Sequence, residues 1–163
     1  GELVGRNTGM MTAYHNRPDA TAAAEWFDRD GRRFIRSGDI GRMDQDGFIQ
    51  LLDRRKDMII SGGFNIYPSD LEAIARQHPA VDEVSVVGVP SEEWGETPVA
   101  FVVRKNGDLT PAEALRSWVN AQLGKTQRLT ELRFISELPR SAMGKVLKRE
   151  LRAPFWARRT SKV

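Results

Sequence analysis

Apolar and polar residues alternate over short stretches of the first third of the chain, which predicts strands linked by tight turns. Strand-like runs lie at 2–6, 33–35 and 48–52, and the last two each follow a turn signal of the form Asp-x-Asp-Gly, DRDG and DQDG. The segment PDATAAAE at 18–25 predicts a short helix, because proline suits a first helical turn and alanine favours helix. The first third is therefore expected to be a β-meander with one helix.

Strand-like and helical patterns alternate in the rest of the chain. Leu71, Ile74 and Ala75 share one face of a predicted helix over 68–77. The sequence TPAE has the form of a capping box with proline at the first helical position, and predicts a helix that ends near residue 123. Strands are expected over 58–60, 81–89, 98–104 and 132–136, followed by a loop over 138–144 and a helix over 145–151. This order predicts an α+β fold in which helices cover a three-stranded sheet.

Five consecutive charged residues, DRRKD at 53–57, separate two apolar strands. Taken alone, such a run indicates a solvated loop. We place a domain boundary here, which gives a β-rich first part over 1–53 and a second domain over 54–163.

Composition narrows the possible functions. The chain has 163 residues, of which 40% are hydrophobic and 29% charged, a mixture typical of soluble globular proteins. The absence of cysteine excludes disulfides, thiol catalysis and cysteine-ligated metal, and favours a cytoplasmic location. The two histidines, His15 and His78, are too far apart in sequence to suggest a zinc site, and we predict no bound metal. The apolar runs are too short for a membrane span.

The net charge of +3 conceals a basic tail. Residues 140–163 contain eight basic residues and one acidic residue, a local charge of +7, so residues 1–139 carry −4. Such a tail favours an anionic partner, although a solvated chain end is the simpler interpretation. Its only aromatic residues are Phe155 and Trp156, which do not form a stacking platform for nucleic acid.

Three segments contain candidate chemistry, and each also has a structural explanation. Asp39 follows a strand, where its carboxylate either accepts hydrogen bonds from ribose hydroxyls or caps a turn. The glycine pair Gly62-Gly63 either lets the backbone approach a ligand closely, as the wall of a narrow tunnel, or forms a tight turn. Lys145 follows a glycine-bearing loop, where it either reaches negative charge developing on a phosphate or carboxylate, or is an ordinary surface lysine.

The order and spacing of these segments are more specific than any one of them. The chain carries GD at 38–39, DRRKD at 53–57, SGGFNIYP at 61–68, WGE at 94–96, and LPR followed by GK at 138–145. This arrangement resembles the carboxy-terminal third of the adenylate-forming (AMP-binding) enzymes, which include acyl- and aryl-CoA synthetases, firefly luciferase and peptide-synthetase adenylation domains. The residues MIISGG at 58–63 and NIYP at 65–68 resemble the corresponding segments of the CoA ligases most.

The resemblance implies a two-step reaction. ATP and a carboxylic acid first give an acyl-adenylate and pyrophosphate, and the thiol of CoA then displaces AMP. Magnesium is implied through ATP. The small carboxy-terminal domain of these enzymes swivels between the two steps.

The resemblance also assigns roles to individual residues. It places Asp39 and Arg54 on the ribose hydroxyls of ATP, Lys145 as the catalytic lysine of adenylation, and Lys56 at the hinge. The residues that it places along the pantetheine tunnel of CoA are Gly62, Gly63 and Phe64.

Two departures from the family pattern affect these expectations. Family members often carry a Tyr-Lys-x-Pro-like stretch before the last strand; here the residues are TQRL at 126–129, so Lys125 and Arg128 are the candidates to contact CoA phosphates. The phosphate loop and acid pocket of the family are not in this sequence. We therefore expect a fragment: residues 1–53 end the large domain, 54–163 form the small domain, and the chain alone is inactive as a ligase. The strands of 1–53 are expected to pair with another copy or to fold back on the small domain.

Two other functions remain open at this point. The adenylate acceptor is either CoA or another nucleophile, such as the thiol of a carrier protein. In a third interpretation, the chain is a non-catalytic module that binds an anionic surface through its basic tail.

Overall fold

The chain folds as two units, Gly1–Lys56 and a second that begins at Asp57, in a computed structural model that describes residues 1–157. Three basic residues of the predicted tail, Arg158, Arg159 and Lys162, lie outside the described residues. Within 1–157, no helix combines the length and the apolar character that crossing a membrane requires. The role of 53–57 as a hinge stays a prediction.

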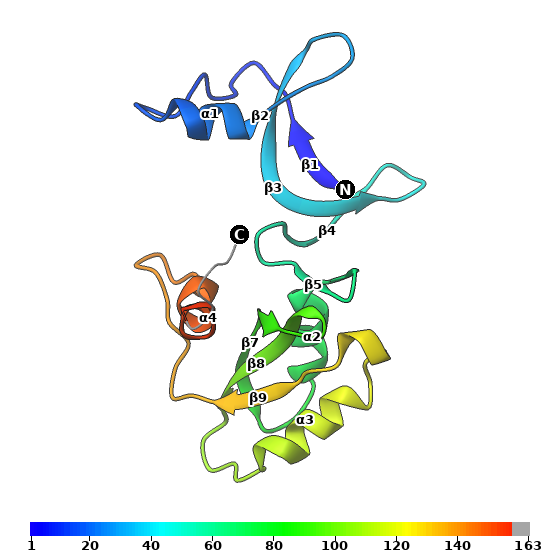
Figure 1. The fold of residues 1–163 in the computed structure, drawn as a ribbon, viewed down its shortest axis with the longest axis vertical. Coiled ribbons are helices and arrows are strands. Elements are labelled where there is room, and N and C mark those ends of the chain that lie inside the picture. Colours follow the sequence, from blue (N-terminus) through cyan, green and yellow to red (C-terminus); the bar gives the residue numbers. More distant parts are fainter. Residues whose placement is uncertain (158–163) are drawn as a thin grey trace. The chain divides into compact units, whose positions relative to one another are not determined.

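The first unit is built around one long strand, β3 (Arg33–Met43), with β1 (Glu2–Gly5) antiparallel on one edge (Figure 1). β2 (Glu25–Phe27) and β4 (Ile49–Arg54) pair with the other edge at opposite ends of β3. A short helix, α1 (Pro18–Ala24), precedes β2. The predicted strands at 2–6, 33–35 and 48–52 correspond to β1, β3 and β4, although β3 extends to Met43, and β2 is an additional strand that the sequence did not predict.

Both Asp-x-Asp-Gly segments of this unit form the same turn. The Asp28 carboxylate accepts the backbone N–H of Asp30 and Arg32, and the Asp44 carboxylate accepts that of Asp46 and Phe48. A side chain that binds backbone two and four residues ahead closes the turn without help from the rest of the fold. The sequence signal was therefore sufficient to predict the turns.

On the two sides of the second turn, the β3–β4 hairpin leaves Met43, Phe48, Ile49 and Leu51 largely exposed. Exposed apolar residues of this kind are compatible with pairing to another chain. Self-association through this unit stays a prediction.

The second unit has a five-stranded sheet. β7 (Val81–Ser91) and β8 (Gly95–Arg104) form a long hairpin, and β9 (Glu131–Phe134) lies parallel to the other edge of β8. β5 (Ile59–Ser61) joins β8 through the pair Ser61–Gly95, and β6 (Phe64–Ile66) pairs with β5. The predicted α+β class is confirmed. The predicted count of three strands is corrected to five, because the short β5–β6 hairpin is also part of the sheet.

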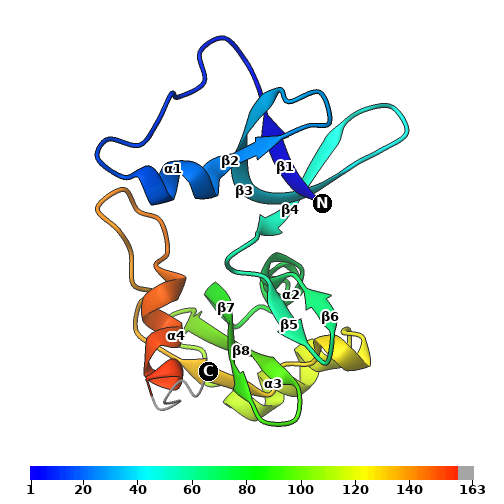
Figure 2. The same ribbon diagram turned by 45° about the horizontal axis from the view of Figure 1, so that its top comes forward.

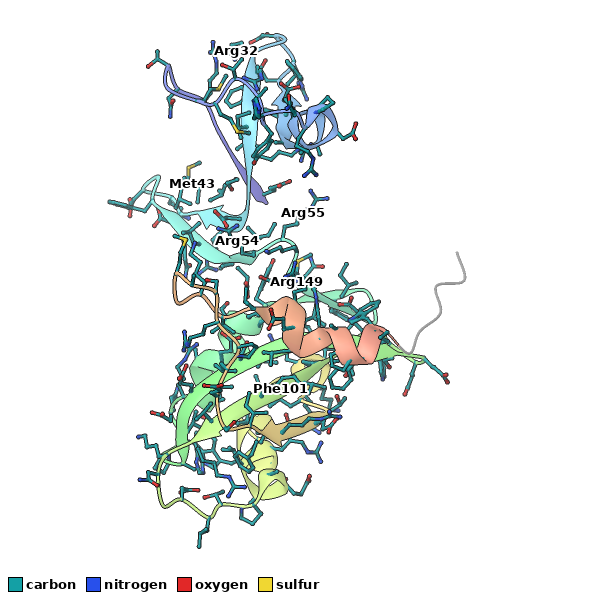
Figure 3. All side chains as sticks on the ribbon, turned by 90° about the vertical axis from the view of Figure 1, so that its left-hand side faces the viewer. Arg32, Met43, Arg54, Arg55, Phe101 and Arg149 are labelled. Carbon is teal, nitrogen blue, oxygen red and sulfur yellow. The ribbon has the colours of Figure 1, made fainter. Side chains whose placement is uncertain are left out.

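Helices cover both faces of this sheet (Figures 1 and 2). On one face, α2 (Pro68–Ala75) and α3 (Ala112–Asn120) bury Leu71, Leu115 and Val119 against β7 and β8. On the other face, α4 (Lys148–Trp156) packs over Phe101, as Figure 3 shows. The rings of Phe101 and Phe155 meet edge to face with centroids 6.2 Å apart.

A buried carboxylate joins three of these elements. Glu72 of α2 accepts the backbone N–H of Val86 in β7 at 2.8 Å and the ammonium of Lys148 in α4 at 2.8 Å. Arg76, one helical turn later, donates to the second oxygen of the carboxylate at 3.3 Å. Burying a carboxylate is costly unless its oxygens are paired, and here both of them are.

The structure corrects two predictions about helix ends. The last helix begins at Lys148 rather than residue 145, because the Leu147 N–H closes the preceding loop onto Pro139. The helix was expected to end at residue 151, but it continues through Pro154 to Trp156. Leu151 and Phe155, on either side of the proline, pack into the core.

The predicted capping box at the start of α3 is also wrong. Pro111 occupies the N-cap position without a side-chain hydrogen bond to the helix. The Thr110 backbone N–H donates to the Asp108 carboxylate at 2.8 Å, and this bond is the main reason that the pKa of Asp108 lies below its ordinary value. Glu113, the expected partner in the box, instead accepts from Arg116.

The two adjacent glycines form the turn of the β5–β6 hairpin. Gly62 has a φ of +55° and Gly63 a φ of +83°, the pattern of a two-residue type I′ turn. A β-carbon on Gly62 would lie 2.7 Å from Cε3 of Trp94, whereas one on Gly63 would meet no atom within 4 Å.

These surroundings predict different costs for two alanine substitutions. Gly63→Ala should lower the free energy of unfolding by about 1–2 kcal/mol, because only the left-handed backbone is disfavoured. Gly62→Ala should cost roughly 1 kcal/mol more, because Trp94 must also move. Urea titrations of the full chain, followed through the amide signals of Val86 and Val102, measure both values. Equal losses in the two variants would contradict the contact between Gly62 and Trp94.

Candidate functional site

The first group of candidate residues lies in the first unit, where β3 and β4 place Asp39 opposite Arg54. Arg54 Nε lies 2.8 Å from Asp39 Oδ1. The preceding Gly38 has a φ of +75°, and the Asp39 N–H donates to the Ser37 hydroxyl, which fixes the strand where the carboxylate projects. The two residues assigned to ribose by resemblance are thus neighbours across one strand pair.

An open pocket of about 360 Å³ adjoins this pair, lined by Glu2, Gly38, Arg54, Arg55 and Lys56. Figure 3 labels Arg54 and Arg55 where β4 ends. Glu2, the acid of the lining, is already bonded to Arg36 at 2.8 Å and to Arg55 at 3.3 Å. The lining therefore contains three cationic side chains and one acidic side chain. Its net positive charge favours an anionic ligand.

The second group belongs to the β5–β6 hairpin of the second unit. The Gly62 N–H donates to the backbone carbonyl of Trp94 at 2.8 Å, which holds the glycine turn against the start of β8. The Glu96 carboxylate accepts the N–H of Ile60 at 3.2 Å and fastens the hairpin from its other side. Phe64 follows the turn and is more than half exposed.

A pocket of about 320 Å³ lies beside the Gly62 turn. Its lining combines the indole of Trp94, two cationic side chains and four hydroxyl groups: Ser61, Trp94, Thr97, Lys125, Thr126, Arg128 and Thr130. Lys125 opens the short 3₁₀ helix η1 (Lys125–Gln127). The two cations that sequence reasoning named as substitutes for the missing family lysine therefore share one pocket.

Trp94 is the member of this pocket that sequence reasoning missed. The segment WGE at 94–96 was interpreted as a structural turn, but only Trp94 lies in the turn between β7 and β8, since Gly95 and Glu96 are the first residues of β8. The only signal in the sequence was a tryptophan directly before a glycine, and the structure adds that Trp94 is half exposed.

The third group is the loop that carries Lys145. An isolated bridge between Arg140 and Val146 narrows the loop, and the Ser141 N–H donates to the Lys145 carbonyl at 2.9 Å. Gly144 has a φ of +78° and turns the chain back toward Ser141. Lys145 is exposed, and its ammonium has no ion-pair partner among residues 1–157. Two other cations of the tail, Arg140 and Lys148, are paired with Glu83 and Glu72.

The structure thus forms three groups from the predicted site residues. Asp39, Arg54 and Lys56 belong to the first unit, while the glycine hairpin and the Lys145 loop belong to the second. Among the described residues, no group of three or more His, Asp or Glu side chains is arranged to hold a metal ion. No residue described is therefore assigned to magnesium. The three groups offer cations, hydroxyls, backbone groups and the Asp39 carboxylate as binding groups.

The sequence matches a family model, the AMP-binding enzyme C-terminal domain, over residues 70–145. It is 43% identical over 155 residues to a 2-succinylbenzoate–CoA ligase of Geobacillus sp. strain WCH70, a match that covers 93% of this chain and 30% of that protein. It is 45% identical over 154 residues to a long-chain-fatty-acid–CoA ligase of Escherichia coli O157:H7, covering 93% of this chain and 26% of that protein. The chain therefore spans under a third of the length of these relatives.

Solved structures give the same result. ATP-bound MatB from Rhodopseudomonas palustris superposes with a TM-score of 0.85 at 34% identity, over 95% of this chain and 30% of that one. An o-succinylbenzoate CoA synthetase from Bacillus subtilis, in complex with its acyl-adenylate, gives 0.80 at 35% identity, over 93% and 30%. The amide bond synthetase McbA from Marinactinospora thermotolerans gives 0.80 at 34% identity, over 95% and 31%.

Sequence and fold agree over nearly the whole chain. Residues 70–145 are an AMP-binding enzyme C-terminal domain, and the chain that contains them corresponds to the C-terminal part of the adenylate-forming enzymes.

Proposed function

We propose that the chain serves an ATP-dependent acyl- or aryl-CoA ligase, which forms an acyl-adenylate and then transfers the acyl group to CoA. The observation that carries the proposal is the presentation of Lys145. Its ammonium projects from a closed loop with no ion-pair partner among residues 1–157, while Arg140 and Lys148 on either side are paired. An unpaired cation on an ordered loop suits the stabilisation of charge that develops during a reaction.

In the first step, a carboxylate oxygen of the acid attacks the α-phosphorus of ATP, and the bond to the β-phosphate breaks with loss of pyrophosphate. Negative charge grows on the α-phosphate oxygens in the transition state. The Lys145 ammonium stabilises that charge. Asp39 binds the ribose hydroxyls as an acceptor, held in place by Arg54 at 2.8 Å. The positive pocket beside Arg54 favours the nucleotide's phosphates.

In the second step, the sulfur of CoA attacks the acyl carbon, and AMP leaves with the electrons of the C–O bond. Gly62 and Gly63 provide slim backbone along which pantetheine extends, with Phe64 at the end of the turn. Lys125 and Arg128 bind CoA phosphates in the pocket beside Trp94. Lys56, at the end of the first unit, acts as the hinge for the change between steps.

A second candidate keeps the adenylation and changes the acceptor. It is favoured by the similarity to McbA, which is an amide bond synthetase. In this case the hydroxyl-lined pocket beside Trp94 would face an acceptor other than CoA, such as an amine or a carrier-protein thiol.

Lys145 can be tested in a chimera. The full chain replaces the matching C-terminal segment of the Geobacillus 2-succinylbenzoate–CoA ligase, and pyrophosphate release is measured with ATP and 2-succinylbenzoate. Lys145→Ala should slow this step about 100- to 1000-fold, the usual loss when one group that stabilises transition-state charge is removed. Thioester formation from preformed acyl-adenylate should stay within a few-fold of the parent chimera.

The matched control for Lys145→Ala is Lys105→Ala, which removes another exposed lysine of the second unit, in the turn after β8. The chain alone is a second control and should release no pyrophosphate. A Lys145→Ala chimera that adenylates at the parent rate would refute the proposed role.

Asp39 should affect nucleotide affinity. Asp39→Asn removes the charge that pairs with Arg54 and weakens acceptance from the ribose, so the KM for ATP in the chimera should rise about tenfold or more. The free energy of unfolding should change little, because the Asp39–Arg54 pair is partly exposed. Asp46→Asn, in the second Asp-x-Asp-Gly turn, is the control. An unchanged KM for ATP in Asp39→Asn would argue against a ribose contact.

The pocket beside Trp94 distinguishes the two acceptors. If it holds CoA, Lys125→Ala and Arg128→Ala should each raise the KM for CoA about tenfold, the effect of losing a charge-assisted hydrogen bond to phosphate. Adenylation should be unchanged, since CoA has no part in it. If both variants keep the parent KM for CoA, the pocket serves something else and the second candidate gains support.

A further inference from the structure

The loop that carries Lys145 is fastened to the sheet by one arginine. Arg140 Nη1 donates to the Gly144 carbonyl at 2.7 Å, and Nη2 binds the Glu83 carboxylate of β7. Gly144 directly precedes Lys145. The guanidinium therefore links a strand of the core to the peptide bond that leads into the candidate catalytic residue.

The rest of the loop repeats this restraint locally. The Lys145 N–H donates to the Ser141 hydroxyl at 3.2 Å, and the Gly144 N–H to the Ser141 carbonyl at 2.8 Å. At the base of the loop, the Leu147 N–H donates to the Pro139 carbonyl at 2.8 Å. These bonds fix the shape of the loop, but they join loop residues only to one another. Of the bonds described here, only those of Arg140 tie the tip of the loop to the sheet.

We propose that Arg140, held by Glu83, is the positioning residue that sets where Lys145 presents its ammonium. This inference rests on the proposed role of Lys145 in adenylation. The planar guanidinium has several donors in a fixed geometry, so one side chain reaches two acceptors at once. A lysine at position 140 would carry the same charge but could not hold the same two acceptors in the same fixed arrangement.

We call the Arg140–Glu83 ion pair, together with the bond from Arg140 to the Gly144 carbonyl, the clamp. It is at the surface, with 43% of the Arg140 side chain and 39% of the Glu83 side chain exposed. Exposed ion pairs add little to the stability of a fold. The clamp can therefore be weakened without unfolding the second unit, and its effect should be confined to the loop.

A small displacement of the loop should change the rate of adenylation measurably. Misplacing a reacting or stabilising group by about 1 Å can cost on the order of 100-fold in rate. Because Lys145 acts on charge that develops in the transition state, a displaced ammonium should lower kcat for adenylation more than it raises the KM for ATP.

The test uses Arg140→Lys and Glu83→Gln, with Arg133→Lys as the matched control. Arg133 is likewise half exposed and is bonded through two nitrogens to one acid, Glu131, but it does not contact the loop. In the full chain alone, both clamp variants should speed hydrogen exchange at the Gly144 and Lys145 amides about tenfold or more. The Val86 and Val102 amides of the core should be unaffected, as should all four amides in the control.

In the chimera with the Geobacillus ligase, Arg140→Lys should lower kcat for pyrophosphate release about tenfold to 100-fold at a nearly constant KM for ATP. Thioester formation from preformed acyl-adenylate should be unchanged. Combining Arg140→Lys with Lys145→Ala should add nothing to Lys145→Ala alone, because Arg140 acts through Lys145.

The outcomes separate this inference from the proposed function. If Lys145→Ala has no effect on adenylation, the proposed function fails, whatever Arg140 does. If Lys145→Ala is deleterious but Arg140→Lys changes neither amide exchange nor kcat, only the positioning role is overturned. Additive losses in the double variant would overturn it as well, since Arg140 would then act on the substrate directly.

Discussion

The second unit depends on one buried charge. Glu72 holds the Val86 N–H of β7 and the Lys148 ammonium of α4, each at 2.8 Å, from its own place in α2. Because α2 and α4 lie on opposite sides of the sheet, this carboxylate connects the two apolar cores. Removing one partner of a buried ion pair typically costs about 3–5 kcal/mol, since the other charge is left uncompensated. The start of α4, and with it the end of the Lys145 loop, is therefore anchored to the centre of the unit.

This anchoring changes how the basic tail is understood. By sequence, residues 140–163 are a cluster of like charges suited to any anionic partner. In the structure, Lys148 is tied to Glu72 and Arg140 to Glu83, so two of the tail's cations are part of the fold's own ion pairs. Lys145, between them, is left facing solvent. Lys145 is therefore presented between two cations that the fold itself neutralises.

The sequence predicted what local pattern determines. The Asp-x-Asp-Gly turns, the apolar face of α2 with Leu71, and the two long strands of the β7–β8 hairpin all follow from residues close together in the chain. β2 and β6 were missed because neither three-residue segment, EWF or FNI, is a run of apolar residues like the Met58–Ile60 segment that predicted β5. The prediction of a capping box at α3 is wrong because the Asp108 carboxylate, and not that of Glu113, accepts the Thr110 N–H. The ion pairs Glu72–Lys148 and Glu83–Arg140 span 76 and 57 residues, and no local pattern reports them. Sequence resemblance thus named Lys145 as a candidate, but it did not name the residues that hold its loop.

An ordered loop also constrains the catalytic cycle proposed for the parent enzyme. A lysine on a flexible loop could swing away from the phosphate by itself once the adenylate has formed. Here the backbone on both sides of Lys145 is bonded, through Arg140 to the sheet and through Lys148 to Glu72, so withdrawal by the loop alone would break several hydrogen bonds. Moving the second unit as a rigid body breaks none of them. If Lys145 must leave before the thiol of CoA arrives, a hinge at the start of this unit is therefore the less costly device, and the charged segment 53–57, which contains Lys56, is where such a hinge would remain solvated.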